Sequence, residues 1–257
     1  MIKAFKNLYR NYLLEKHKVP EYLWQRTVAK LPVLAYLQTD ELQLLREITT
    51  LFLYKKDFIA AQGFKLDDEK QLIIAAQACL AVLNLDIDYY DGWREIIVYP
   101  DTFVVNRDIT DTHGLVHKEI RALSGESWMK GPVVLSWQDV QLDSFQLREG
   151  HNVVIHEFSH KLDMLNGRAN GMPPLHPSMH REEWTDSLSN AYKHLQKLLK
   201  SHQSHYINDY AATDPAEFFA VVSEYFFTAP KALKQHRPAV YEQLVLFYKQ
   251  DPESNQQ

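Results

Sequence analysis

Apolar residues recur at helical spacing through the first third of the chain. Residues 39–41 (Thr-Asp-Glu) can begin a helix, because acidic side chains stabilise a first helical turn. The apolar positions that follow recur at helical spacing: Leu42, Leu45, Ile48, Leu51 and Phe52. Residues 67–69 begin a second helix, which is almost wholly apolar around Cys79. The pattern therefore predicts a helical N-terminal part over residues 1–90.

The pattern changes between residues 94 and 140. Short β-prone runs occupy residues 95–99, 103–105 and 133–135, with Pro, Gly and Asp between them. Helical spacing returns from residue 152 and again over 182–200, 215–227 and 239–249. We therefore predict an α+β fold in which a small, mostly antiparallel sheet and further helices form a second part over residues 91–250. The two parts are expected to form one compact unit, followed by a flexible tail at 251–257.

The clearest chemical signal lies where the helical pattern returns. Apolar residues 153–155 precede His156, Glu157 and His160, which together form an HExxH pattern. Residues i and i+4 share one helical face, so the two imidazoles can bind a single zinc ion. Glu157 is then placed to act as general base on a water at that metal. Two surface histidines on an amphipathic helix are the alternative, and the apolar residues before His156 favour the metal site.

A catalytic zinc commonly takes three protein ligands, so a third is expected downstream. Glu217 belongs to a predicted helix that Asp214 caps and Pro215 begins. The carboxylate of Glu217 could instead close a capping box with Asp214. Glu224, two turns further along the same face, is the rival ligand. A carboxylate among Phe and Ala residues should face a partner, because an unpaired buried charge is costly. The spacing favours Glu217 over Glu224.

Other potential ligands fit less well. Asp163 is so near His160 in sequence that orienting an imidazole suits it better than binding the metal. His176 and His180 lie in a loop-like stretch that could fold over the metal. The spacing of metzincins, with a third histidine six residues after the second, is absent because Asn166 occupies that position. The loop over residues 166–179 could also be a mobile lid, or only a connection.

These motifs resemble the Mlc titration factor A family of bacterial zinc metallopeptidases. The resemblance lies in residues 156–163, 214–220 and 223–227, and upstream in 74–80, 99–100 and 131–137, so that it covers about residues 20 to 252. It implies a zincin-like second part, similar to the catalytic core of anthrax lethal factor, with one zinc per chain bound by His156, His160 and Glu217. The family's third ligand follows a tyrosine by seven residues, and Tyr210 stands at that offset. The resemblance therefore implies that Tyr210 stabilises an oxyanion, although ordinary loop packing is its alternative role.

Two classes of function follow. The first is a zinc-dependent peptidase, which the resemblance suggests is an aminopeptidase. The second is a regulatory protein, because the resemblance implies binding of the glucose repressor Mlc and control of sugar-transport genes without a need for proteolysis. Residues 132–137 form a candidate edge strand for a peptide substrate, or a simple core strand. The aromatic residues of the C-terminal helices are expected to form core rather than a partner-binding face.

Composition narrows the setting. The net charge of −5 and the absence of a basic stripe argue against direct nucleic-acid binding. The single cysteine, Cys79, cannot form an internal disulfide framework, which favours a reducing compartment. The first ten residues have no apolar segment of a signal peptide, and no apolar run is long enough to span a bilayer. We therefore expect a cytoplasmic protein without membrane association.

Overall fold

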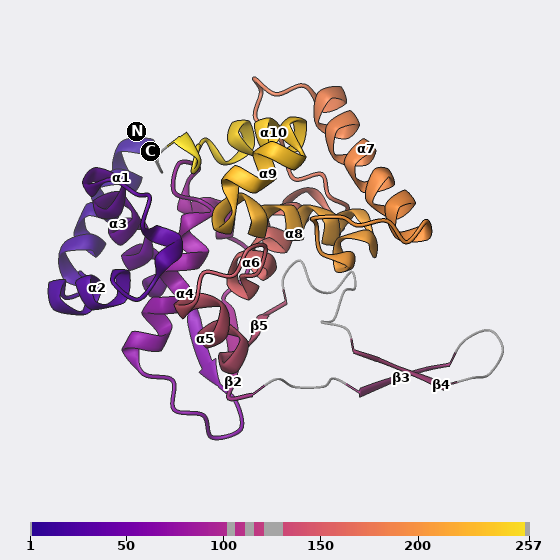
Figure 1. Cartoon of the computed structure of the whole chain (residues 1–257). Helices are drawn as coiled ribbons and strands as arrows, with labels where there is room; N and C mark the ends of the chain where they lie inside the picture. Colours follow the sequence, from indigo (N-terminus) through magenta and orange to yellow (C-terminus); the bar gives the residue numbers. More distant parts are fainter. Residues whose placement is uncertain (1, 102–105, 111–115, 121–130, 255–257) are drawn as a thin grey trace.

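A computed structural model describes residues 2–101, 106–110, 116–120 and 131–254 (Figure 1). The α+β class is confirmed. The α-helices are α1 (Ile2–Lys16), α2 (Glu21–Val28), α3 (Thr39–Lys55), α4 (Asp68–Leu80), α5 (Trp137–Phe145), α6 (Val153–Asp163), α7 (Arg181–Lys200), α8 (Pro215–Thr228), α9 (Pro230–His236) and α10 (Pro238–Tyr248). Short 3-10 turns are η1 (Pro32–Leu34), η2 (Ile87–Tyr90), η4 (Met164–Asn166) and η5 (Asp209–Ala212). None of the described helices is both long and apolar enough to cross a membrane.

The helices predicted from spacing form where the capping residues indicated. Asp67 precedes α4, and its side chain accepts a hydrogen bond from the backbone N–H of Lys70. Helix α3 begins at Thr39 with a capping box in which the Glu41 carboxylate accepts from the backbone N–H of Gln38. Both caps satisfy amide groups that a helix leaves unpaired at its start. These two caps are formed by residues next to the helix, which explains why the starts of α3 and α4 can be predicted from local sequence.

The main sheet differs from the prediction. Strands β1 (Asp57–Ala60), β2 (Glu95–Tyr99) and β5 (Val133–Ser136) form a three-stranded sheet in the order β1-β2-β5, and both pairs are parallel. The expected antiparallel arrangement is therefore wrong for this sheet. Parallel neighbours need a long crossover, and helix α4 lies in the connection from β1 to β2. The sequence pattern does not predict strand β1, because this strand is mostly exposed and has no run of buried apolar residues.

A second, two-stranded sheet is antiparallel. It pairs β3 (Asn106–Thr110) with β4 (Val116–Ile120), with Asn106 opposite Ile120. The strand expected over residues 103–105 lies outside the described residues. Strand β5 is at one edge of the described three-stranded sheet, which agrees with the edge position proposed for residues 132–137.

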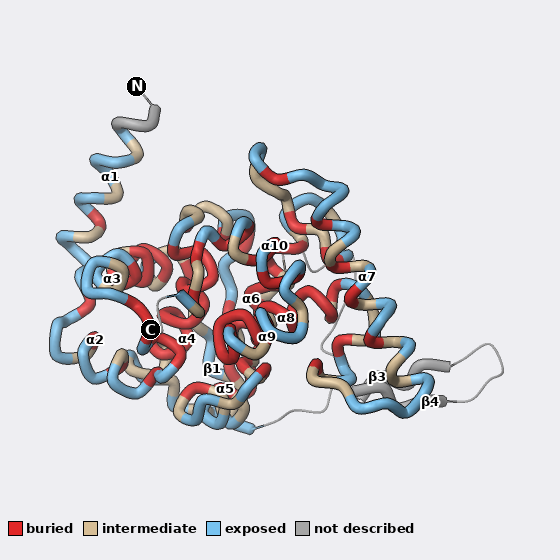
Figure 2. The backbone as a smooth tube through the Cα atoms, turned by 45° about the horizontal axis from the view of Figure 1, so that its top comes forward, coloured by how far each residue is buried: buried red, intermediate tan, exposed pale blue. Residues whose placement is uncertain are grey.

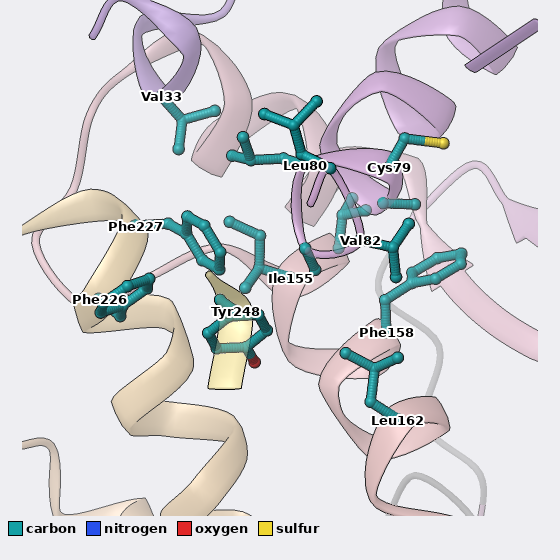
Figure 3. Packing of buried hydrophobic residues seen from close by; sticks show 14 of the residues in the cluster. Val33, Cys79, Leu80, Val82, Ile155, Phe158, Leu162, Phe226, Phe227 and Tyr248 are labelled. Carbon is teal, nitrogen blue, oxygen red and sulfur yellow. The ribbon is translucent and has the colours of Figure 1, made fainter. Parts of the chain in front are cut away.

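The core gathers around α6. Helix α6 packs against α8 and α4, and the tube in Figure 2 shows these central helices as mainly buried. Ile155, Phe158 and Leu162 are fully buried and lie in one cluster with side chains of α4 and α8 (Figure 3). Their spacing leaves His156 and His160 on a different face of α6, which is only half-buried. The apolar face of the helix therefore fixes where its polar face points.

The aromatic residues of the C-terminal helices belong to this core. Those that are buried include Phe218, Phe219, Phe226, Phe227, Tyr241, Phe247 and Tyr248. Cys79 is also buried and makes no disulfide. The prediction of core packing for these side chains is confirmed.

A glycine permits the close approach of α8 to the segment before α6. Gly150 has φ +70°, and a Cβ atom there would overlap the ring of Tyr225. Its backbone N–H donates to the Thr228 hydroxyl at 2.8 Å. Gly63 has nearly the same backbone, φ +71°, but open space around it. Replacement of either glycine would therefore introduce backbone strain, but only replacement of Gly150 would also introduce steric overlap.

We expect Gly150→Ala to destabilise the fold far more than Gly63→Ala. The left-handed backbone costs an alanine about 1–2 kcal/mol at either position, whereas overlap with Tyr225 adds about 1–3 kcal/mol only at Gly150. The free energy of unfolding in urea measures both losses. Equal losses would show that Tyr225 is free to move away and that this approach does not constrain the fold.

Candidate metal centre

Helix α6 places two imidazoles together. The side chain of Asn152 caps the helix by accepting from the N–H of Ile155 at 3.0 Å, so helical geometry is established before the first histidine. His156 and His160, one turn apart, have ring centroids separated by 4.9 Å. Their Nε2 atoms lie 3.2 Å apart. Each side chain is only 13% exposed, so the two nitrogens face inward rather than into bulk water.

Helix α8 supplies a carboxylate to the same place. Asp214 caps α8 by accepting from the backbone N–H groups of Ala216 and Glu217 at 2.8 and 3.0 Å. The carboxylate of Glu217 does not turn back to complete a capping box. Its Oε2 lies 3.1 Å from Nε2 of His156 and 3.3 Å from Nε2 of His160. The three residues are a group that could hold a metal ion.

The distances suit a small divalent cation. Donor atoms about 2.0–2.1 Å from a tetrahedral zinc lie about 3.3–3.4 Å from one another, and the three observed separations are 3.1, 3.2 and 3.3 Å. Oε2 of Glu217 is buried yet makes no hydrogen bond of acceptable geometry among the described residues. A buried carboxylate oxygen without a hydrogen bond is costly. A cation at this point would satisfy it together with both imidazoles.

Glu224 does not join the group of potential metal donors but contacts one of them. Its Oε1 accepts from Nδ1 of His156 at 2.8 Å, on the side of the ring away from Glu217. A proton on Nδ1 leaves Nε2 with a free lone pair directed at the metal position. Sequence reasoning missed this role, because spacing places Glu217 and Glu224 on one face without showing which imidazole nitrogen each one meets.

Electrostatics in the centre favour a positive charge. Burial alone would lower the pKa of His156, but the carboxylates of Glu224 and Glu217 outweigh burial and raise this pKa well above its usual value. Burial acts in the opposite direction on Glu217, yet its contacts with the two imidazoles keep the pKa of the carboxyl well below its usual range. The Glu217 carboxyl is therefore kept ionised beside the two imidazoles, where a cation would also be stabilised.

Glu157 and Tyr210 lie beside this group. Glu157 is half-buried and takes part in no hydrogen bond or ion pair among the residues that the structure describes, so its oxygens are available. Tyr210, in η5, has its ring centroid 6.0 Å from that of His156. Partial burial and the neighbouring Glu217 carboxylate raise the pKa of the Tyr210 hydroxyl. The hydroxyl therefore keeps its proton at neutral pH and can donate it in a hydrogen bond.

The structure gives Asp163 another task than orienting an imidazole. Its Oδ2 accepts from the backbone N–H groups of Asn170 and Gly171 at 2.8 and 2.7 Å. Nδ1 of His160 has no hydrogen-bond partner among the described residues. Gly171 in turn accepts, through its carbonyl, the indole N–H of Trp184 at 3.0 Å. These bonds hold the start of the loop after α6 and favour a connection over a mobile lid.

Gly171 also sets the distance between that loop and α8. Its φ is +75°, and an added Cβ atom would lie 2.5 Å from the carbonyl oxygen of Pro215, the first residue of α8.

The other downstream histidines take no part in the metal group. His176 contacts the carbonyl of Phe247 at 2.8 Å, and His180 is exposed at the start of α7.

Two histidines and a glutamate on one helix, with a second carboxylate from a later helix, are typical of a metallopeptidase. Comparison with known proteins gives the same class. The profile of the family described as glucose-regulated metallo-peptidase M90 matches residues 5–249. The chain therefore belongs to this family, and the resemblance seen in its motifs is confirmed.

Curated relatives of this family cover most of the chain. A protein of Escherichia fergusonii is 44% identical over 232 residues, which are 89% of this chain and 86% of that protein. One from Klebsiella pneumoniae subsp. pneumoniae is 43% identical over 235 residues, or 90% and 87% of the two chains. One from Salmonella choleraesuis is 42% identical over the same extent. All three are called Mlc titration factor A.

We expect replacement of a proposed metal donor to lower metal binding more than replacement of Glu224. His160→Ala and Glu217→Gln should lose the metal on dialysis, because only two donors remain. Glu224→Gln should retain it with an affinity lower by about 10–100-fold, the usual cost of removing a group that orients a ligand. Metal content after loading with zinc and dialysis measures this. The matched control is His180→Ala, which should keep the wild-type content, and a loss there would assign the metal to the loop instead.

Proposed function

We propose that this protein is a zinc-dependent peptidase that acts on peptides with a free amino terminus. We also propose that it binds a transcriptional repressor. The observation that carries the first proposal is the convergence of Nε2 of His156, Nε2 of His160 and Oε2 of Glu217 within 3.3 Å of one another. Two imidazoles and one carboxylate are donors that suit zinc, and three protein donors leave a position open. Zinc bound there would supply Lewis acidity, which lowers the pKa of water and polarises a carbonyl.

Glu157 is the proposed general base. It follows His156 directly on α6, and its carboxylate has no competing hydrogen bond or ion pair in the described parts of the chain. It would accept the proton of the attacking water and pass it to the leaving amine, as a carboxylate does in general acid–base catalysis. His156 keeps its own orientation during this transfer because Glu224 holds its Nδ1.

Tyr210 is the proposed donor to the oxyanion. Its ring lies next to that of His156, and its side chain is 47% exposed, so the hydroxyl can reach a substrate as well as the protein. A hydroxyl that stays protonated stabilises the negative oxygen of the tetrahedral intermediate by a hydrogen bond. The 3-10 turn η5 holds it in place, because Asn208 accepts from the backbone N–H of Tyr210 at 2.9 Å.

The substrate is proposed to bind along β5. This strand is at an edge of the described sheet, and an edge offers unpaired backbone groups to an extended peptide. Lys161, the residue after His160, donates to the carbonyl of Gly131 at 2.7 Å, just before β5 begins. This hydrogen bond therefore connects helix α6 with the segment that leads into the proposed docking strand, β5. The amino-terminal preference follows from the resemblance to the family.

The second proposed function is binding of the glucose repressor Mlc. It is supported by the relatives, which are named for titrating Mlc and which align with about 90% of this chain. Binding of this kind requires a surface rather than a catalytic step, so the two functions can reside in one chain. A variant that lacks the general base but keeps the metal ligands separates them.

We expect Glu157→Gln to lower peptide hydrolysis by about 10²–10⁴-fold, since an amide cannot accept the proton. Zinc content and binding to purified Mlc should stay at wild-type values. The assay compares amino-acid p-nitroanilides with their N-acetylated forms, and cleavage restricted to the free amines supports an aminopeptidase. The control, Glu183→Gln on the exposed first turn of α7, should cleave normally. Undiminished cleavage by Glu157→Gln would disprove the mechanism.

Replacing Tyr210 should affect turnover rather than substrate binding. We expect Tyr210→Phe to lower kcat by about 10²–10³-fold with little change in KM, because the lost hydrogen bond forms to the oxyanion and not to the ground state. Tyr206→Phe is the matched control on the same segment, since its hydroxyl bonds to Glu149 at 2.9 Å instead. Equal kcat values for both variants would leave Tyr210 as loop packing.

A further inference from the structure

A line of buried polar side chains connects α4 with the metal centre. Gln77, in the last turn of α4, is fully buried, as are Asn152 at 1% exposure and Ser144 at 2%. The Asn152 side-chain amide donates to Oε1 of Gln77 at 2.7 Å. The backbone N–H of Asn152 donates to Oε2 of Glu224, whose other oxygen accepts from His156. Gln77 is thus three contacts from a proposed metal ligand, although it belongs to the N-terminal helices.

The direction of each amide in this line is fixed by its ends. At one end, Nε2 of Gln77 donates to the carbonyl of Ile73 at 3.0 Å, and a carbonyl can only accept. Oε1 of Gln77 must then face Asn152, so Asn152 must present its NH₂ group to Gln77. At the other end, Oδ1 of Asn152 accepts from the N–H of Ile155, which can only donate. Neither amide can turn over without losing a bond at both ends.

Asn152 is therefore held by more than its role as a helix cap. Its side chain has one oxygen for Ile155 and one NH₂ group for Gln77, and both are used. The position of its backbone N–H decides where Oε2 of Glu224 lies, and a carboxylate held at one oxygen turns about that point. A shift of Asn152 would consequently move the other oxygen relative to Nδ1 of His156.

We propose that Gln77 is a positioning residue for the metal centre, acting through Asn152 and Glu224 on the orientation of His156. This inference rests on the proposed binding of zinc by His156, His160 and Glu217, and it adds a residue that touches neither metal nor substrate. A buried amide that only stabilised α4 would not need to lie in a fixed direction between two other helices. Ser144 of α5 supports the same orientation by accepting from Nε2 of Gln77 at 2.8 Å.

The test compares two buried glutamines, each of which donates to a backbone carbonyl of α4. Gln77→Met removes the contact with Asn152 while nearly preserving volume. Gln250→Met is the matched control, because Gln250 is also buried and donates to a carbonyl of α4, that of Leu80 at 2.8 Å, away from the metal. Both variants lose a buried amide, so both should lower the melting temperature of the metal-free protein.

Only Gln77→Met should change the metal. We expect its zinc dissociation constant, measured by competition with a chelator, to rise by about tenfold, the lower end of the effect of groups that orient a ligand. The visible spectrum of its cobalt-substituted form should change, whereas Gln250→Met should match the wild type in both measurements. Wild-type affinity and spectrum in Gln77→Met, or an equal rise in both variants, would overturn the proposal. A wild-type protein that binds no zinc would instead overturn the proposed peptidase.

Asn152→Ser provides a second variant should Gln77→Met not fold. Serine also caps helices, but it has no NH₂ group to reach Gln77. Its zinc dissociation constant should rise as well, and the double variant should lose no more affinity than the weaker-binding single variant, because residues in one network are not additive. Additive losses, or unchanged affinity in Asn152→Ser, would show that Gln77 and Asn152 do not act together on His156.

Discussion

The burial of the Glu217 carboxylate against two imidazoles is the interaction on which this structure depends. A carboxylate taken out of water loses its hydration, and hydrogen bonds or a cation must replace it. Here the imidazoles face Oε2 of Glu217 without completing hydrogen bonds to it. A cation bound at this point would provide that replacement. The remaining features of the site hold these three side chains in place.

Packing between helices provides that restraint. The buried face of α6 is occupied by Ile155, Phe158 and Leu162, so the helix cannot rotate its histidines away without exposing the core. Helix α8 is buried along nearly its whole length and contacts α6 directly. Two rigid elements with large apolar contacts are better supports for a metal centre than loops, because their side chains are already confined to a few rotamers.

Local sequence was sufficient for the helices and for the paired histidines. Asp67 and Asp214 mark helix starts by capping, and an i, i+4 spacing places His156 and His160 together whatever the rest of the chain does. Non-local features could not be predicted in this way. The parallel pairing of β2 with β5 depends on which strands meet after long connections, and exposed β1 shows no buried pattern. The contact of Glu224 with Nδ1 of His156, and the line from Gln77 through Asn152, depend on how three helices meet.

The absence of a side chain at Gly171 has a consequence for the evolution and engineering of this centre. The backbone there, held by Asp163 of the metal helix, approaches the carbonyl of Pro215, which stands two residues before Glu217. Because residue 171 has no side chain, its backbone can lie close to both the end of α6 and the start of α8, the two helices that carry the proposed donors. A larger side chain at residue 171 would overlap the first residue of α8, so a change there acts on the helix that carries Glu217 without touching Glu217 itself.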